Sequence, residues 1–294
     1  MATLADIDLR EGYADLGEVR LHYLEAGPLE APPVVLLHGF PDFWYSWRHQ
    51  IPVLAAAGFR VIAPDMRGYN LSSKPSEISA YAPARLAADI RALILERGAE
   101  RACVAGHDWG AAVAWLTAIN HPGVVERLAI LNVPHPRRML EALRRPGLQI
   151  AKSWYMFFFQ LPWLPERAVR ADGWRAFRHG FEHDARPGAF TPADIDRYRE
   201  AWSQPGAATA TINYYRASMR RPPGRERRGL APITAPTLVI WGENDRYLSS
   251  ALAEPDRTDV PALTEVVRIP DASHWVQHDA PERVNQLLIE HFRA

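Results

Sequence analysis

The chain has 294 residues, 48% of them hydrophobic, so it is long enough and apolar enough to bury a sizeable core. Its 34 basic residues balance its 34 acidic residues, which gives no reason to expect nucleic acid or an anionic membrane as a partner. The single cysteine, Cys103, excludes an internal disulfide and a cysteine-based metal site, and the sequence shows neither a signal peptide nor a membrane-spanning run, so a soluble cytoplasmic protein is expected.

The first part of the chain predicts strands that alternate with helices. Strands are expected at 19–25, 34–37, 60–63, 102–105 and 128–131, and helices at 84–97 and 109–120. This alternation favours a parallel sheet with helices on both faces.

The pattern changes after residue 133. From 134 to 231 apolar and aromatic residues recur at helical spacing, and Thr191-Pro192 marks a helix start. Strands resume at 237–241 and 265–269, and a helix at 281–292 closes the chain. The sequence therefore predicts an α/β core formed by 1–133 and 232–294, with a helical lid at 134–231 inserted into it. Arginine clusters at 137–145 and 220–228 are interpreted as solvated surface.

The segment Gly-His-Asp-Trp-Gly at 106–110 lies between a predicted strand and a predicted helix. In that context the pattern G-x-nucleophile-x-G presents its central side chain above the sheet. A carboxylate is better suited to displacing a leaving group from saturated carbon than to attacking a carbonyl, because the first reaction gives a stable alkyl ester. Asp108 is therefore the expected nucleophile, with an epoxide oxygen or a halide as leaving group. The alternative is that Asp108 only caps the helix.

Two polar residues nearer the C-terminus also follow predicted strands, at the edge where α/β sheets build their sites. Asp245 is expected to be the acid of a catalytic triad and His274 its base, in the order nucleophile, acid, histidine. Glu243 and Asp271 are the alternative acids, and His278 is expected in a supporting or surface position.

With these motifs the chain resembles the epoxide hydrolases of the α/β-hydrolase superfamily. The segments that carry the resemblance are His-Gly-Phe-Pro at 38–41, Asp-Met-Arg-Gly-Tyr-Asn-Leu-Ser-Ser at 65–73, Gly-His-Asp-Trp-Gly at 106–110, Trp-Gly-Glu-Asn-Asp at 241–245 and Ser-His-Trp at 273–275. The resemblance implies the α/β-hydrolase fold and conversion of an epoxide to a vicinal diol through an ester on Asp108, with no cofactor or metal. It also implies an oxyanion hole from the backbone N–H groups of Phe40 and Trp109. Pro41 is a candidate cis proline, and His38 is expected to be structural.

The resemblance further assigns two tyrosines of the predicted lid as acids for the opening epoxide oxygen. A phenol with a pKa near 10 suits so basic an oxygen. Tyr155 matches the first tyrosine by its spacing to the Phe-Gln that follows, and Tyr215 matches the second, directly before an arginine, with Tyr214 as its alternative. Tyr198 is expected to serve packing. The expected substrate-binding residues are Phe40, Pro41, Trp109, Tyr155 and Tyr215, and the aromatic lid predicts an apolar or aromatic epoxide.

Other functions compete with this hypothesis. Haloalkane dehalogenases are similar in their aspartate, histidine and Trp109, whose indole N–H would bind halide. Their second halide donor is often an asparagine where this chain has Phe40, so Trp154 or Trp163 would have to replace it. Fluoroacetate dehalogenases carry arginines just after the nucleophile, which this chain lacks. A non-catalytic ligand receptor is the alternative of another class, and a homodimer is kept as a hypothesis for the assembly.

Overall fold

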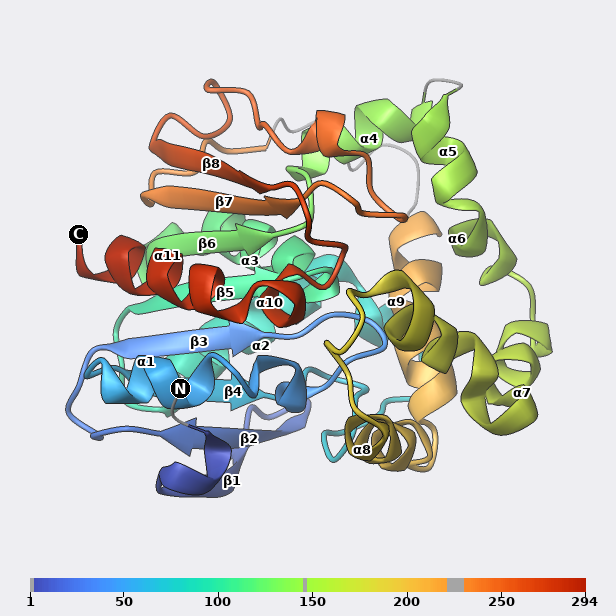
Figure 1. The fold of residues 1–294 in the computed structure, drawn as a ribbon, viewed down its shortest axis with the longest axis horizontal. Helices are drawn as coiled ribbons and strands as arrows, with labels where there is room; N and C mark the ends of the chain where they lie inside the picture. Colours follow the sequence, from blue (N-terminus) through green and yellow to red (C-terminus); the bar gives the residue numbers. More distant parts are fainter. Residues whose placement is uncertain (1–2, 145–146, 221–229) are drawn as a thin grey trace.

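The computed structural model describes residues 3–144, 147–220 and 230–294. Arg145 and most of the second arginine cluster, 221–228, therefore lie outside the described residues. The centre of the molecule is an eight-stranded sheet in the order β1-β2-β4-β3-β5-β6-β7-β8 (Figure 1). The strands are β1 (Leu9–Asp15), β2 (Arg20–Ala26), β3 (Pro33–Leu37), β4 (Arg60–Pro64), β5 (Ala102–His107), β6 (Val125–Leu131), β7 (Thr237–Gly242) and β8 (Leu263–Ile269).

The sheet is parallel from β4 to β8, and only β1 and β2 run antiparallel to their neighbours. Its inner strands are buried on both faces, as their apolar sequences require. In β3 alternate residues enter two different hydrophobic clusters: Val35 and Leu37 point to one, Val34 and Leu36 to the other. The prediction of a mostly parallel sheet covered on two sides is confirmed.

Helices cover both faces. α2 (Pro83–Glu96) and α3 (Trp109–Asn120) pack in the first cluster, and α1 (Ile51–Ala56) and α11 (Pro281–Arg293) in the second, next to the short α10 (Val276–Asp279). Every strand and helix expected in this part of the chain is present, with β6 beginning three residues before its predicted start. Three elements of this part were not expected: the half-exposed edge strand β1, the six-residue helix α1 and the four-residue helix α10.

A helical insertion follows β6 and precedes β7. It contains α4 (Pro136–Arg144), α5 (Leu148–Lys152), α6 (Trp154–Phe158), α7 (Leu164–His179), α8 (Pro192–Trp202) and α9 (Ala207–Met219). Thr191 caps α8 as predicted, since its hydroxyl accepts a hydrogen bond from the Asp194 N–H. The insertion lies beyond the carboxyl ends of the central strands (Figure 1), and its aromatic residues Phe177, Tyr198 and Trp202 join the first core cluster. Across the described ranges, no helix combines the length and the hydropathy that crossing a membrane requires.

Candidate active site

Asp108 lies at the sharp turn between β5 and α3. Its backbone has φ 50° and ψ −123°, a conformation that costs energy for a residue with a side chain and that recurs at functional sites. The glycines on both sides allow the turn, because a Cβ on Gly106 would overlap the backbone of Gly110, and one on Gly110 would overlap the carbonyl of Leu37. The turn therefore packs tightly under β3 and holds the Asp108 side chain at the carboxyl edge of the sheet.

The two carboxylate oxygens of Asp108 have different surroundings. Oδ1 accepts a hydrogen bond of 2.7 Å from the backbone N–H of Phe40. Oδ2 lies 3.4 Å from Nε2 of His274. Burial alone would raise the pKa of Asp108, but the hydrogen bond and the charge of His274 outweigh it and hold the pKa below its ordinary value. Asp108 is therefore ionised at neutral pH.

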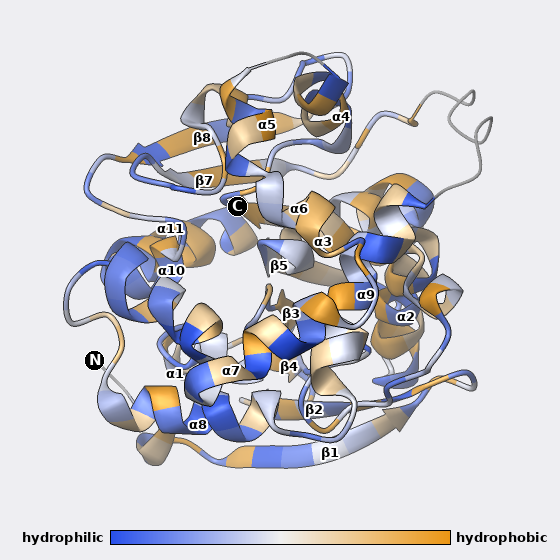
Figure 2. Cartoon of the chain, turned by 90° about the vertical axis from the view of Figure 1, so that its right-hand side faces the viewer, coloured by the Kyte–Doolittle hydropathy of each residue, from blue (hydrophilic) through white to orange (hydrophobic). Residues whose placement is uncertain are grey.

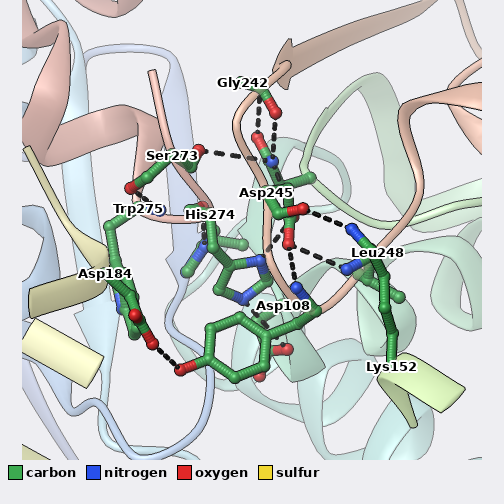
Figure 3. A network of polar contacts seen from close by, with 12 residues as sticks. Asp108, Lys152, Asp184, Gly242, Asp245, Leu248, Ser273, His274 and Trp275 are labelled. Atoms are coloured by element: carbon green, nitrogen blue, oxygen red, sulfur yellow. Dashed lines mark hydrogen bonds and ion pairs between the residues drawn. The ribbon is translucent and has the colours of Figure 1, made fainter. Parts of the chain in front are cut away.

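His274 lies between two carboxylates (Figure 3). Its Nδ1 is 2.7 Å from Oδ2 of Asp245, while Oδ1 of Asp245 accepts the backbone N–H groups of Tyr247 and Leu248. Burial opposes a charge on His274, but Asp245 and Asp108 together raise its pKa to about 10. The competing acids are not in the site, since Glu243 and Asp271 are both exposed. The structure thus brings together the three residues predicted from the sequence.

Asn132 also supports this site, and the sequence analysis missed it. It follows β6 directly and adopts a positive φ of 50°. Its side-chain Nδ2 donates to Oδ2 of Asp245 at 2.9 Å, and its Oδ1 accepts the backbone N–H of Gly242 at 2.9 Å. Asn132 therefore fixes the acid and the end of β7 together. Its place directly after a buried strand was the available signal.

His107 and Asp42 lie close to the triad, and their contact was not predicted either. Nε2 of His107 is 2.8 Å from the backbone carbonyl of His274, so Nε2 carries the proton and Nδ1 faces Asp42 at 3.7 Å. Burial lowers the pKa of His107 to about 3 and raises the pKa of Asp42 to about 7. The adjoining His-Gly-Phe-Pro segment pointed to this region, but nothing in the sequence indicated that Asp42 meets His107.

Tyr155 on α6 and Tyr215 on α9 meet at the site, with ring centroids 5.7 Å apart. The Tyr215 ring also packs edge-on against Trp109 at 5.1 Å and Phe40 at 5.2 Å. Burial and the charge of Asp108 raise the pKa of both phenols, so both stay protonated at neutral pH. Tyr214 points elsewhere, because its hydroxyl donates to the backbone carbonyl of Arg67 at 2.6 Å.

The remaining predicted residues have clear places. The Phe40–Pro41 peptide bond is cis, as proposed. His38 holds the loop, since its Nε2 accepts the backbone N–H of Met66 at 2.9 Å. His278 is buried against Arg48 and is not a surface residue.

Three further expectations concern the rest of the site. Tyr198 is fully buried among aromatic rings, in agreement with a packing role. Trp154 and Trp163 are 65% and 68% exposed, so the suggestion that either replaces a halide donor in the site is wrong. Among the residues with described positions, no three histidine, cysteine or carboxylate side chains cluster as metal ligands would.

The chain is similar in sequence and fold to known proteins. The family described as alpha/beta hydrolase fold matches residues 32–281. The chain is 42% identical over 285 residues to AB hydrolase superfamily protein YfhM of Bacillus subtilis (strain 168), covering 96% of this chain and 97% of that protein. It is 37% identical over 275 residues to Epoxide hydrolase 4 of Homo sapiens, covering 92% and 75%. The crystal structure of Epoxide Hydrolase A from Mycobacterium thermoresistibile superimposes with a TM-score of 0.86 at 34% identity, covering 98% of this chain and 99% of that chain.

Proposed function

The chain belongs to the α/β-hydrolase family, in which its similar relatives include epoxide hydrolases, and from this premise we propose that it hydrolyses an epoxide to a vicinal diol through an ester on Asp108. The observation that carries the proposal is an aspartate at the nucleophile position, 3.4 Å from His274, with two tyrosines of the helical insertion meeting beside Trp109, the next residue. An aspartate there suits attack on saturated carbon, and the phenols suit a leaving oxygen.

In the first step Oδ2 of Asp108 attacks an epoxide carbon. Oδ1 is already bonded to the Phe40 N–H, so it becomes the carbonyl oxygen of the ester while Oδ2 forms the new bond. The carbon–oxygen bond of the epoxide breaks, and its oxygen takes a proton from Tyr155 or Tyr215. Attack removes the negative charge of Asp108, which had raised the pKa of both tyrosines, so proton release becomes easier as the alkoxide forms.

In the second step water hydrolyses the ester. Once Asp108 is esterified, His274 loses one of its two carboxylate partners and its pKa falls, so its proton passes to the phenolate left by the first step and the neutral imidazole can take a proton from water. The resulting hydroxide attacks the ester carbonyl, whose oxygen is held by the N–H of Phe40, with the N–H of Trp109 at the start of α3 as the second donor. Collapse of the intermediate breaks the bond between the carbonyl carbon and the alkyl oxygen, and this oxygen takes the proton of the new carboxyl group. The diol leaves with Asp108 ionised and His274 protonated, as in the free enzyme.

The helical insertion acts as a lid in this proposal. It supplies Tyr155 and Tyr215, and its aromatic side chains border the site, as the contact of Phe159 with the Tyr215 ring shows. Apolar walls of this kind suit an apolar or aromatic epoxide, since small-molecule sites bury most of the ligand surface. Haloalkane dehalogenation is the weaker candidate, because Phe40 offers no side-chain donor and the two tryptophans that could have replaced one are exposed.

The test gives the purified protein styrene oxide and 1-bromobutane in parallel and measures diol and bromide. Asp108→Ala removes the nucleophile, and Asp271→Asn, which changes an exposed carboxylate, is the matched control. We expect diol from the wild type and from Asp271→Asn, none from Asp108→Ala, and no bromide. Bromide without diol would replace the proposal with a dehalogenase, and ligand binding without turnover of any epoxide in a survey would indicate a receptor.

A further inference from the structure

The chain has a net charge of zero, but it consists of two parts with opposite net charges. Residues 134–231, the insertion with its flanking loops, contain eighteen of the 34 basic residues and nine of the 34 acidic ones. This part therefore carries a net charge of about +9 and the rest of the chain about −9 with histidines neutral. The net charge of the whole chain gives no reason to expect an anionic partner, but the charge of residues 134–231 does.

The same part exposes apolar side chains. Among the described residues twelve large hydrophobic side chains are exposed, and eight of them belong to the insertion. Six follow one another in the short segment from α5 to the start of α7: Leu148, Trp154, Phe157, Leu161, Trp163 and Leu164. Figure 2 faces this side of the molecule and shows hydrophobic colour on α6. Soluble monomers rarely gather exposed aromatic residues in this way without an interaction partner.

Cations border these apolar residues. Arg167 and Arg170 line an open surface groove of about 740 Å³ together with Trp163. In the part of the chain with described positions, neither arginine has a carboxylate within ion-pair distance, and the nearby Glu166 is already paired with Arg216. Arg220 adds a further exposed cation, since it bonds to the carbonyl of Gln160 beside Leu161.

We propose that this face, formed by α6, the start of α7 and the adjoining arginines, docks on the surface of an anionic lipid bilayer. Tryptophan and phenylalanine insert at the level of the lipid headgroups, and arginines bind the phosphates and the negative surface around them. A second copy of the chain is a poorer occupant, because a two-fold contact would place Arg167 and Arg170 of one copy against those of the other.

The face also adjoins the proposed catalytic site. α6 carries Tyr155, which lies at the site, next to Trp154 and Phe157, which are 65% and 51% exposed. If the proposed function holds, an apolar epoxide dissolved in the bilayer would reach the site without crossing bulk water. Docking itself does not depend on that activity.

The test is sedimentation of the full chain with vesicles of phosphatidylcholine containing 30 mol% phosphatidylglycerol, against phosphatidylcholine alone, without substrate. We expect binding to the anionic vesicles only, weakened by added salt. Trp154→Ser/Phe157→Ser/Trp163→Ser and, separately, Arg167→Glu/Arg170→Glu should each lower the partition coefficient at least about tenfold. Thermal unfolding of each variant establishes that it is folded, and the exposed arginine pair serves as the test should the aromatic variant not fold.

Matched controls separate a local face from general properties. Arg91→Glu/Arg283→Glu makes the same change of net charge at two exposed positions outside residues 134–231. Leu29→Ser/Leu95→Ser removes two exposed apolar side chains, also outside that range. Both should bind as the wild type does. The proposal would be overturned if Arg167→Glu/Arg170→Glu and Arg91→Glu/Arg283→Glu lost vesicle binding equally, or if the wild type did not bind anionic vesicles. So would a dimer, seen by sedimentation velocity without lipid, that the aromatic variant abolishes. Failure to bind vesicles would not affect epoxide turnover, which is measured separately.

Discussion

His274 contacts a carboxylate through each ring nitrogen, and this determines its charge in the free enzyme. Asp245 lies 2.7 Å from Nδ1 and Asp108 3.4 Å from Nε2. Despite its burial, the histidine is therefore protonated at neutral pH, and its pKa of about 10 belongs to the state in which Asp108 is free. In the proposed reaction, formation of the ester removes one carboxylate charge, which lowers the pKa of His274 before water is activated.

The raised pKa of His274 makes a prediction about stability and pH. Its ordinary value, near that of the unfolded chain, is 6.5, and its folded value is about 10. The stabilisation is complete below pH 6.5 and is lost as pH rises towards 10. Chemical denaturation at pH 6 and pH 10 should show the wild type losing about a few kcal/mol more than His274→Gln. Equal losses in both proteins would show that the histidine is not charged in the folded state.

Two adjacent tyrosines offer a matched comparison. We expect Tyr215→Phe to slow ester formation roughly 10- to 100-fold in single-turnover experiments, because it removes one proton donor for the epoxide oxygen. Tyr214→Phe loses only the bond to the Arg67 carbonyl, so it should lower the free energy of unfolding by about 1 kcal/mol and leave ester formation nearly unchanged. The reverse result would assign the acid to Tyr214.

Single catalytic residues could be predicted from the sequence where a polar residue follows a predicted strand. Asp108, Asp245 and His274 could each be found that way, and Asn132 could have been found by the same argument. The contact between Asp42 and His107 could not, because their 3.7 Å separation depends on how the loop after β3 packs against the end of β5. Burial then sets the pKa of Asp42 near 7, and burial of an individual carboxylate cannot be read from a motif.

The elements that position the site are the carboxyl ends of β3, β5, β6, β7 and β8. The β-branched and apolar runs of these strands, each bounded by glycine, proline or a polar residue, made them predictable. β1 escaped prediction because it is an edge strand with a half-exposed, mixed sequence, and α1 because six residues are too few to show a helical period. Neither element contributes a side chain to the site.

Gly110 allows α3 to pack closely against β3. Gly110→Ala places a methyl group against the Leu37 carbonyl, so α3 must shift away from the sheet. We expect a loss of about 1–3 kcal/mol in the free energy of unfolding together with lower turnover, because the shift moves Asp108. Gly123→Ala, where a Cβ would meet nothing within 4 Å, is the control and should change stability by less than about 0.5 kcal/mol. A fully active Gly110→Ala would contradict the tight packing of the turn.

The residues of the proposed reaction come from two parts of the chain. The sheet and its loops supply Asp108, Asp245 and His274, and the insertion supplies Tyr155 and Tyr215. The helical character of the insertion was predictable from its periodicity, but the meeting of its tyrosines with the sheet rested on a resemblance to a family and needed the structure to be seen. The separation of charge between the two parts was visible in the sequence but was averaged out in the net charge.

One measurement tests the ester on Asp108 most directly: a single turnover of styrene oxide in oxygen-18 water with enzyme in excess. Hydrolysis breaks the bond between the acyl carbon and the oxygen that Asp108 contributed, so that oxygen leaves with the product. We predict an unlabelled diol and oxygen-18 in the peptide that contains Asp108, detected by mass spectrometry. A labelled diol with an unlabelled Asp108 peptide would mean that water attacks the epoxide directly and that no ester forms on Asp108.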